Sequence, residues 1–235
     1  MRTIGLLGGM SWESSATYYE LINKEVKTRL GGLHSASCIM YSVDFHQMER
    51  YQSTGKWEKA GQLLANAARS LEQAGASFII LCTNTMHKVV DMIQAAITVP
   101  VLHIADATAK TIKQKGMKNV GLLGTAYTME QDFYKSRLEE HGIHVVIPDQ
   151  EERRNINDII FNELCLGHTH TSSRAVFQKV INGLIEQEAE GVILGCTEIG
   201  MLLKSEDVIL PIFDTTTIHA LEAVNQSLKG GIQLE

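Results

Sequence analysis

Two stretches of this 235-residue chain decide its fold: FIILCTNT at residues 78–85 and VILGCTE at residues 192–198. Each is an apolar run that stops at small polar residues. The apolar parts are continuous and show no alternation with polar side chains, which is typical of strands buried on both faces of a parallel sheet. The two stretches therefore predict two buried strands whose carboxyl ends carry hydroxyl, amide and thiol groups.

The surroundings of the two stretches also match. IGLLGG at residues 4–9 is echoed by VGLLGT at residues 120–125, and VPVL at residues 99–102 is echoed by ILPI at residues 209–212. The matched segments follow one order, at separations of 116, 113 and 111 residues. A shared order at a nearly constant separation predicts two halves of similar build that face each other. A cleft between such halves allows one small molecule to be attacked from both sides.

Helical patterns fill the segments between the strands. Apolar residues recur at helical spacing over residues 57–74 and again over residues 176–188, each time just before one of the two strands. A third helical pattern, over residues 218–228, is expected to return the end of the chain to the first half. Strands that alternate with helices in this way predict an α/β fold.

The repeat also predicts where the domains divide. We expect two similar, pseudo-symmetric α/β domains with parallel sheets, and an active site in the cleft between them. The first domain would comprise residues 1–98 plus about 213–235, and the second would comprise residues 99–212. A chain of 235 residues is long enough for two small domains of this kind.

Composition excludes several classes of protein. The chain is 44% hydrophobic with a formal net charge of −6 and no basic cluster, so we expect neither a nucleic-acid partner nor a membrane partner. No apolar run approaches the length that crosses a bilayer, and the first residues lack the pattern of a signal peptide. The four cysteines show no CxxC or metal-type spacing, which predicts reduced thiols in a cytoplasmic protein.

Metal and nucleotide motifs are weak in this sequence. His168 and His170 form a metal-like pair, but no third ligand accompanies them at a suitable spacing, so we expect an exposed loop and no metal. The glycines at residues 5–9 follow the pattern GxxGG rather than the GxGxxG dinucleotide fingerprint. We therefore assign them to a tight strand–helix turn and expect no nicotinamide cofactor.

The chemistry is expected at the carboxyl ends of the strands, where ligands bind in parallel α/β sheets. Hydroxyl, amide and backbone N–H groups ahead of a helix suit a carboxylate ligand. The candidate residues at four such ends are Met10, Ser11, Thr83, Asn84, Thr85, Thr125, Thr128, Cys196, Thr197 and Glu198.

The four cysteines differ in what their positions predict. Cys38 and Cys165 are expected to be small buried hydrophobes, and Cys165 lies in a helical pattern. Cys196 instead follows a glycine at the end of a buried strand and precedes Thr197 and Glu198. A cysteine at such a position acts as a nucleophile or a base when its pKa is lowered there.

Four motifs together resemble one known family over almost the whole chain, the cofactor-independent aspartate/glutamate racemases. The motifs are GGMSWES at residues 8–14, NTMH at residues 84–87, LGT with YTM at residues 123–129, and GCTE at residues 195–198. Glutamate racemases of cell-wall synthesis usually carry histidine after the second Cys-Thr. Glu198 stands at that position, so the chain is similar to the aspartate racemase branch.

The resemblance implies a mechanism without pyridoxal phosphate. Two cysteines face the substrate α-carbon from opposite sides; one thiolate removes the α-proton, and the other group returns a proton to the opposite face. The implied substrate is aspartate and/or glutamate, and the implied assembly is a homodimer. The implied substrate-binding residues are Met10, Ser11, Gln52, Asn84, Thr85, Thr125, Thr128 and Thr197.

The sequence departs from the family pattern at two positions. The family reads Cys-Asn-Thr in the first half, whereas this chain has Thr83 before the asparagine and Cys82 one residue early. Because adjacent side chains of a strand point to opposite faces, Cys82 is expected to point away from the substrate. The catalytic pair is then Cys196 and Thr83, which favours the L-enantiomer as substrate. At the second position, Leu166 stands where many aspartate racemases place a lysine.

Other functions fit the same residues. A single-cysteine decarboxylase of the same superfamily would use only Cys196 and an apolar pocket. A maleate isomerase would need two cysteines and fits less well. An amino-acid-binding protein without turnover is the alternative outside the enzymes. Exchange of the substrate α-hydrogen with solvent separates a racemase from a binding protein.

Overall fold

The computed structural model describes residues 1–229, which divide into two compact units. We call unit 1 the part that comprises residues 1–104 and the chain from His219 onward, and unit 2 the part that comprises Ala105–Ile218. Within the described residues, none of the helices is both long and apolar enough to cross a membrane.

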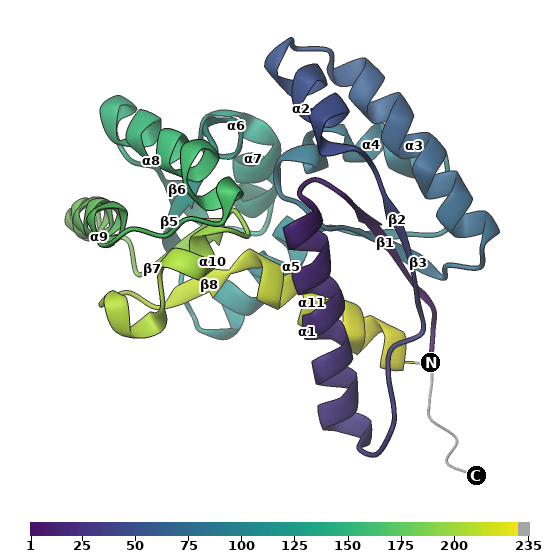
Figure 1. Ribbon diagram of the computed structural model, residues 1–235. Helices are drawn as coiled ribbons and strands as arrows, with labels where there is room; N and C mark the ends of the chain where they lie inside the picture. The colour runs from purple at the N-terminus through teal and green to yellow at the C-terminus, as the bar shows by residue number, and fades with distance from the viewer. Residues whose placement is uncertain (230–235) are drawn as a thin grey trace. The chain divides into compact units, whose positions relative to one another are not determined.

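Unit 1 is built on a parallel four-stranded sheet (Figure 1). Its strand order is β2 (Cys38–Ser42), β1 (Ile4–Gly8), β3 (Phe78–Leu81) and β4 (Val101–Leu102). The sheet is parallel throughout, so its carboxyl ends lie at one edge. The helical elements that accompany it are α1 (Trp12–Leu30), α2 (Phe45–Ser53), α3 (Trp57–Gln73), η1 (Thr85–Val89), α4 (Val90–Gln94) and α11 (Thr215–Leu228), which begins in unit 2.

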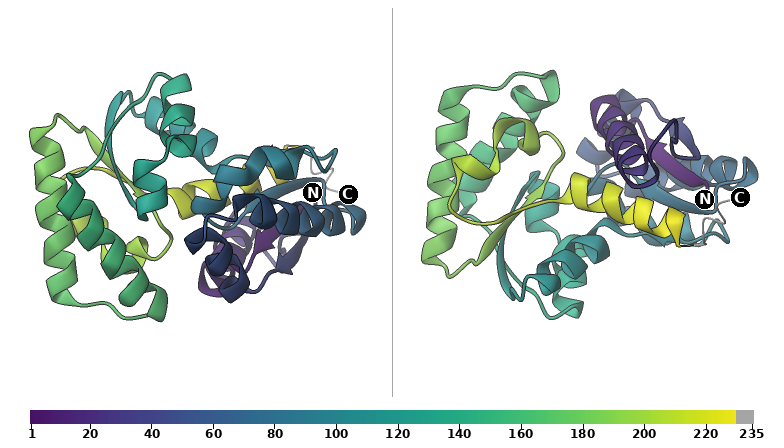
Figure 2. Two further views of the ribbon diagram at one scale, coloured as in Figure 1. Left: turned by 90° about the horizontal axis from the view of Figure 1, so that it is seen from above. Right: turned by 90° about the horizontal axis from the view of Figure 1, so that it is seen from below.

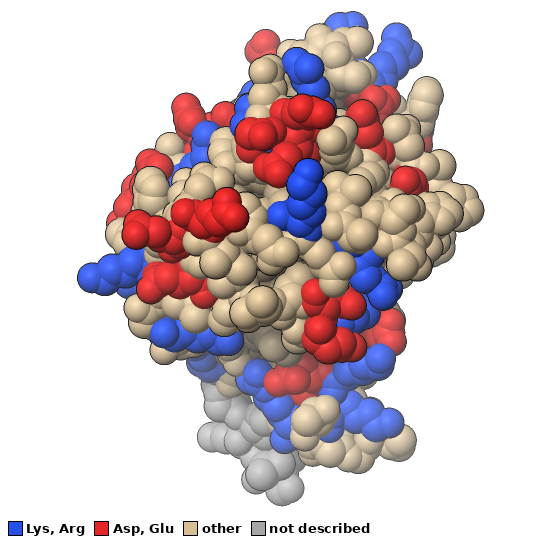
Figure 3. All heavy atoms as spheres, turned by 90° about the vertical axis from the view of Figure 1, so that its left-hand side faces the viewer, with Lys and Arg blue, Asp and Glu red and all other residues tan. Residues whose placement is uncertain are grey.

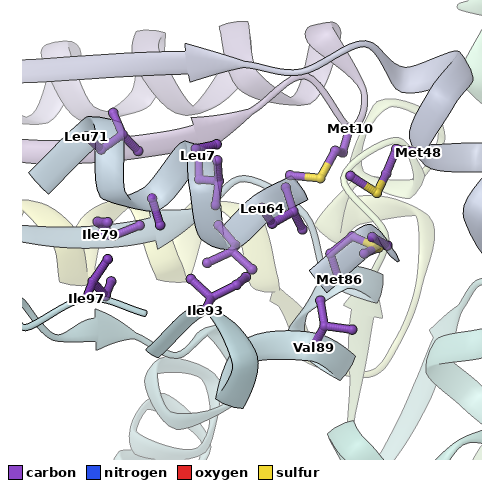
Figure 4. Packing of buried hydrophobic residues seen from close by; sticks show 14 of the residues in the cluster. Leu7, Met10, Met48, Leu64, Leu71, Ile79, Met86, Val89, Ile93 and Ile97 are labelled. Atoms are coloured by element: carbon purple, nitrogen blue, oxygen red, sulfur yellow. The ribbon is translucent and has the colours of Figure 1, made fainter. Parts of the chain in front are cut away.

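The central strands of unit 1, β1 and β3, are buried on both faces, as the continuous apolar runs predict. Ile79 and Leu81 of β3 belong to a cluster that contains Leu64 and Leu71 of α3 (Figure 4). Phe78 and Ile80 belong to a second cluster with residues of α1 and α11. Alternate residues of one strand thus enter two separate cores. Burial of each such large side chain contributes about 1.5–3 kcal/mol to stability.

Unit 2 repeats this sheet with the same connection order. Its strand order is β6 (His144–Val146), β5 (Asn119–Gly124), β7 (Gly191–Gly195) and β8 (Ile212–Asp214), again all parallel. Helices α8 and α9 lie side by side in both views of Figure 2. The helical elements are α5 (Ile104–Gln114), α6 (Ala126–Glu130), α7 (Asp132–Glu140), α8 (Gln150–Asn162), η2 (Leu164–Leu166), α9 (Thr171–Glu186), α10 (Ile199–Leu202) and η3 (Ser205–Asp207).

The two sheets confirm the predicted fold class of two similar parallel α/β units, but the units divide at other residues than expected. Because β4 pairs with β3, residues 99–104 lie with unit 1 rather than with the second half. Because β8 pairs with β7, residues 213–218 lie with unit 2 rather than with the first half. The observed boundaries, after Ile104 and Ile218, therefore lie one short strand and its turn beyond the expected boundaries after residues 98 and 212.

Three local predictions meet the structure with small differences. The helix expected over residues 218–228 exists, but it begins earlier, at Thr215. The helical pattern that ran to Glu188 ends at Glu186, and Glu188 has a positive φ of 64°. The segment around Cys165, expected to be helical, is a short 3-10 turn that ends at Gly167 in the left-handed conformation.

Candidate active site at the strand ends

The turn after β1 requires a glycine and builds the start of α1. Gly9 has a φ of +89°, and a Cβ at this position would lie 2.2 Å from the carbonyl oxygen of Val43. The Gly9 N–H donates to Ser15 Oγ at 2.7 Å, and Ser11 caps α1 by accepting from the Ser14 N–H at 3.2 Å. This turn therefore holds buried Met10 and Ser11 at the carboxyl edge of the sheet of unit 1.

The end of β3 separates Cys82 from Thr83. Cys82 is fully buried and belongs to the apolar cluster that holds Phe78 and Ile80, so the strand alternation continues through it. Burial raises the pKa of the Cys82 thiol far above its usual value. The thiol of Cys82 is therefore part of the packing of unit 1 and is held in its neutral form.

Strand register shows which residues of the two units correspond. Leu7 pairs with Leu81 in unit 1, and Leu123 pairs with Leu194 in unit 2. Thr83 lies two residues after Leu81, and Cys196 lies two residues after Leu194. The two residues therefore occupy equivalent positions in the two units. The equivalence of these two positions, first read from the sequence repeat, thus follows from the backbone pairing as well.

The backbone around Thr83 is fixed by side chains as well as by other backbone groups. Ser14 Oγ donates to the carbonyl of Cys82 at 2.8 Å. His87 Nδ1 lies 2.9 Å from the carbonyl oxygen of Thr83, and the His87 N–H donates to the carbonyl of Asn84 at 3.1 Å. Three consecutive carbonyls are therefore held, two of them by buried side chains from α1 and η1.

Gln52 is the one predicted site residue of unit 1 that comes from outside a strand end. It lies near the end of α2, is buried, and its Nε2 lies 3.0 Å from Met86 Sδ. Met86, Met48 and Met10 lie close together in Figure 4 and belong to one cluster. The Gln52 amide therefore contacts the thioether of Met86. Asn84 and Thr85, which are also buried, follow β3 at the carboxyl edge of the sheet.

In unit 2, the turn after β5 brings two threonines together. Thr125 caps α6 by accepting from the Thr128 N–H at 3.4 Å, and the two hydroxyl oxygens lie 3.2 Å apart. Gly195 packs closely against this turn, because a Cβ there would lie 3.2 Å from Cγ2 of Thr128. The predicted residues Thr125 and Thr128 therefore lie beside the end of β7, which carries Cys196 and Thr197.

Cys196 lies in contact with an acidic side chain at the end of β7. The residue is buried, and its Sγ–H donates to Glu198 Oε2 at 3.0 Å. Burial raises the pKa of the Cys196 thiol well above its usual value, and the neighbouring charge of Glu198 raises it further. In this structure Cys196 is therefore a protonated thiol beside a carboxylate that can accept its proton.

Three buried histidines, His87, His103 and His219, lie around the Thr83 turn, and none of them is a predicted site residue. The ring centroids of His87 and His103 lie 4.5 Å apart, and those of His87 and His219 lie 5.9 Å apart. The sequence signal was the position of His103, directly after the short strand β4.

The metal-type pair His168 and His170 is exposed, with ring centroids 6.4 Å apart. Across residues 1–229, no group of three or more His, Cys, Asp or Glu side chains has the arrangement of a metal site. On the face drawn in Figure 3, acidic and basic side chains are interspersed. Such a face lacks the continuous basic surface that nucleic-acid binding requires.

The fold and the strand-end residues define a two-domain α/β enzyme with acid–base groups at its strand ends. The family model for Asp/Glu/hydantoin racemases matches residues 7–223. The chain therefore belongs to the Asp/Glu/hydantoin racemase family, and its enzyme class is that of the isomerases that racemise amino acids.

Three similar proteins illustrate the match. A Yersinia pestis protein whose crystal structure is provisionally described as an Asp/Glu racemase is 55% identical, with a TM-score of 0.92 over 97% of this chain and 100% of that one. An aspartate racemase homologue from Pyrococcus horikoshii is 38% identical, with a TM-score of 0.84 over 97% and 99%. The broad specificity amino-acid racemase RacX of Bacillus subtilis is 25% identical over 96% of this chain and 98% of its own length.

Proposed function

We propose that this protein racemises aspartate and/or glutamate without pyridoxal phosphate, by removing the α-proton and returning a proton to the other face. The observation that carries the proposal is the register equivalence of Thr83 and Cys196. One of them is a thiol and the other a hydroxyl, so the two directions of the reaction use different bases.

The first proposed step is ionisation of Cys196. Its proton moves along the 3.0 Å contact to the Glu198 carboxylate, which leaves a thiolate and a neutral acid. The thiolate then takes the α-proton, so that the Cys196 thiol re-forms and the negative charge moves to the substrate. General acid–base steps of this kind contribute about 10²–10⁴-fold to the rate.

The second proposed step is delivery of a proton to the other face of the α-carbon through the Thr83 hydroxyl, which takes up a proton from solvent water as it gives one. The proton held by Glu198 then passes to solvent, which restores the starting protonation state. A hydroxyl is essentially un-ionised near neutral pH, so Thr83 can donate or relay a proton but is a poor base. We therefore propose that abstraction starts from the L-enantiomer, which uses Cys196. The opposite direction requires Thr83 as the base. Because the two enantiomers have equal free energies in solution, kcat/KM for conversion is the same in both directions, and the asymmetry is expected in α-hydrogen exchange, which Cys196 can perform on the L-form without inversion.

An α-proton beside a carboxylate is far less acidic than a thiol, so the developing negative charge needs preorganised donors. We assign this role to the hydroxyl, amide and backbone N–H groups at both sets of strand ends. They include Ser11 and Thr125, which already cap helices, and the buried amide of Gln52. The full proposed substrate-binding set is Met10, Ser11, Gln52, Asn84, Thr85, Thr125, Thr128 and Thr197.

The proposed substrate range includes both acidic amino acids rather than aspartate alone. Leu166 supplies no cation at the position where many aspartate racemases place a lysine, and its side chain is exposed in η2. The likeness to a broad specificity racemase also supports a wide range. By the same family likeness we propose a cytoplasmic homodimer, which sedimentation velocity would check.

The test is exchange of the α-hydrogen in deuterated solvent, with each enantiomer of every amino acid assayed separately. We expect exchange with aspartate or glutamate, much faster from the L-form. Equal initial exchange rates from both enantiomers would contradict the one-sided mechanism. Binding of amino acids without any exchange would identify a binding protein. Release of carbon dioxide from a disubstituted malonate, without amino-acid exchange, would identify a decarboxylase.

A further inference from the structure

A buried cluster of aromatic and imidazole side chains lies within unit 1, behind the turn that carries Thr83. It consists of Tyr18, His87, His103 and His219, none of which is more than 6% exposed. Tyr18 comes from α1, His87 from η1, His103 from the segment after β4, and His219 from α11. We call this group the histidine cluster. The proposed chemistry uses none of its members, although one of them touches the Thr83 peptide.

The hydrogen-bond partners fix where His87 carries its proton. The backbone N–H of Ile104 donates to His87 Nε2 at 3.3 Å, so that nitrogen is the acceptor. Nδ1 therefore bears the hydrogen and donates to the carbonyl oxygen of Thr83 at 2.9 Å. Burial, with repulsion from His103 and His219, lowers the pKa of His87 well below its usual value. The ring is thus a neutral donor aimed at the Thr83 peptide.

His219 has the opposite tautomer and completes the support. Its Nε2–H donates to the carbonyl of Leu102 at 2.9 Å, and its Nδ1 accepts from the Tyr18 hydroxyl at 2.9 Å. These contacts fix the β4 end, after which Ile104 presents its N–H to His87. The His87 ring is therefore clamped between two backbone groups, and its orientation is determined from both sides.

We propose that His87 is a positioning residue that holds the Thr83 peptide, and through it the Thr83 hydroxyl, in the orientation that proton delivery requires. This inference rests on the proposed function. A threonine side chain turns with its backbone, and a hydroxyl that cannot ionise depends on alignment for proton transfer. A misplacement of about 1 Å in a reacting group costs about 10²-fold in rate.

Two substitutions separate the two contacts of His87. His87→Asn keeps an amide N–H near the place of Nδ1, so it retains the hold on Thr83 and loses the contact with Ile104. His87→Gln reaches the place of Nε2 with its carbonyl oxygen, so it keeps the contact with Ile104 and releases Thr83. Each variant leaves one buried backbone group without its partner, at a similar cost in stability.

The measurements are kcat and KM for racemisation of L-glutamate or L-aspartate, with the folded fraction checked by circular dichroism. We expect His87→Gln to lose on the order of 10–100-fold in kcat with KM nearly unchanged, and His87→Asn to recover most of that loss. Equal kcat for the two variants, or a larger loss in His87→Asn, would overturn the inference.

Tyr18→Phe is the matched control, because it breaks a hydrogen bond of the same cluster without touching Thr83. This variant should lower the free energy of unfolding and leave kcat unchanged. A loss of kcat equal to that of His87→Gln would show that the cluster has a merely structural role, and it would overturn the inference. Hydrogen-exchange mass spectrometry of the peptide over residues 82–87 gives a second readout. His87→Gln should speed amide exchange there more than His87→Asn does.

The two proposals fail in different ways. Wild-type protein that exchanges no amino-acid α-hydrogen would overturn the proposed function, and proton delivery by Thr83 with it. Wild-type protein that racemises amino acids while His87→Gln keeps full kcat would overturn the positioning inference alone.

Discussion

The end of β3 and the end of β7 occupy the same register position in two sheets of the same build, yet they are supported differently. The carbonyl of Thr83 accepts from a buried histidine side chain, whereas that of Cys196 accepts from the backbone N–H of Ile199 at 3.2 Å. The repeat places Gly200 at the position equivalent to His87, so unit 2 has no such histidine.

The second difference is the polar neighbour of each reacting group. Cys196 has the Glu198 carboxylate at 3.0 Å from its sulfur, which suits a group that must lose a proton. Thr83 has fixed backbone around it, which suits the proposed relay of a proton through its hydroxyl. In the proposed mechanism, two sheets of the same build thus differ in their acid–base tasks through one or two side chains placed just after the strand.

The largest expected effect comes from removing the thiol of unit 2. Cys196→Ser should lower kcat for aspartate or glutamate on the order of 10³-fold, because serine is hardly ionised near neutral pH. The measurement is racemisation followed by chiral chromatography. Cys82→Ser is the matched control: it buries a hydroxyl in an apolar cluster, so it should cost about 1–3 kcal/mol of stability and little activity. Loss of turnover in folded Cys82→Ser, with activity kept in Cys196→Ser, would reverse our assignment of the strand ends.

Glu198→Gln should produce two opposite changes at the same strand end. The loss of the proton acceptor should lower kcat on the order of 10²-fold. The loss of its negative charge should lower the pKa of Cys196, because that charge now raises it. Iodoacetamide should therefore alkylate Cys196 faster in this variant at a given pH, measured by mass spectrometry of the peptide. Slower alkylation together with unchanged kcat would remove Glu198 from the mechanism.

The histidine cluster should make unit 1 sensitive to acid. Burial lowers the pKa of His219 from 6.5 to about 4 in the folded protein, and the pKa of His87 is also lowered. Below pH 6.5 the two histidines bind protons in the unfolded chain but stay neutral in the folded protein. Their contribution to the free energy of unfolding is therefore fully present above pH 6.5 and is lost as the pH falls toward 4. His219 alone should remove about 2 kcal/mol between pH 7 and pH 5. Urea unfolding at both values measures the change, and a His219→Gln variant with the same pH dependence as wild type would contradict it.

The smallest expected effect is a gain. Thr83→Cys gives the end of β3 the same group as the end of β7, so abstraction from the D-enantiomer should become about 10-fold or more faster. Exchange from the L-enantiomer should change little. The assay is α-deuterium exchange from each enantiomer by NMR. A variant that folds and binds the D-form yet exchanges it no faster would show that the two strand ends differ by more than the identity of this side chain.

Much of this fold could be predicted because both sheets use continuous apolar strands and the repeat gives their order twice. The boundaries were harder to predict, since β4 has only two residues and its pairing with β3 decides where residues 99–104 belong. Pairing is a long-range choice that local pattern does not encode. The helical pattern around Cys165 is shorter than expected for a local reason, because the 3-10 turn that contains it ends at Gly167, whose φ is +78°.

Some residues of the candidate site could likewise be predicted from the sequence, and others could not. Cys196, Thr83 and Glu198 could be found because strand ends are readable and the contact of Cys196 with Glu198 spans only two residues. The histidine cluster could not, because Tyr18 and His219 are 201 residues apart in the sequence and meet only in the folded unit. A single buried histidine in a sequence has the same appearance whether it packs, caps a helix or orients a neighbour.

The discontinuous makeup of unit 1 has a consequence for synthesis on the ribosome. Ala220, Ala223 and Val224 of α11 pack in the cluster that covers one face of β1 and β3. The N–H of Arg2 also donates to the carbonyl of Ser227 at 2.9 Å. Unit 2 is one unbroken run, Ala105–Ile218. The half that is translated first therefore waits, with one apolar sheet face covered only in part by α1, until α11 emerges, and the nascent chain is prone to aggregation during that interval.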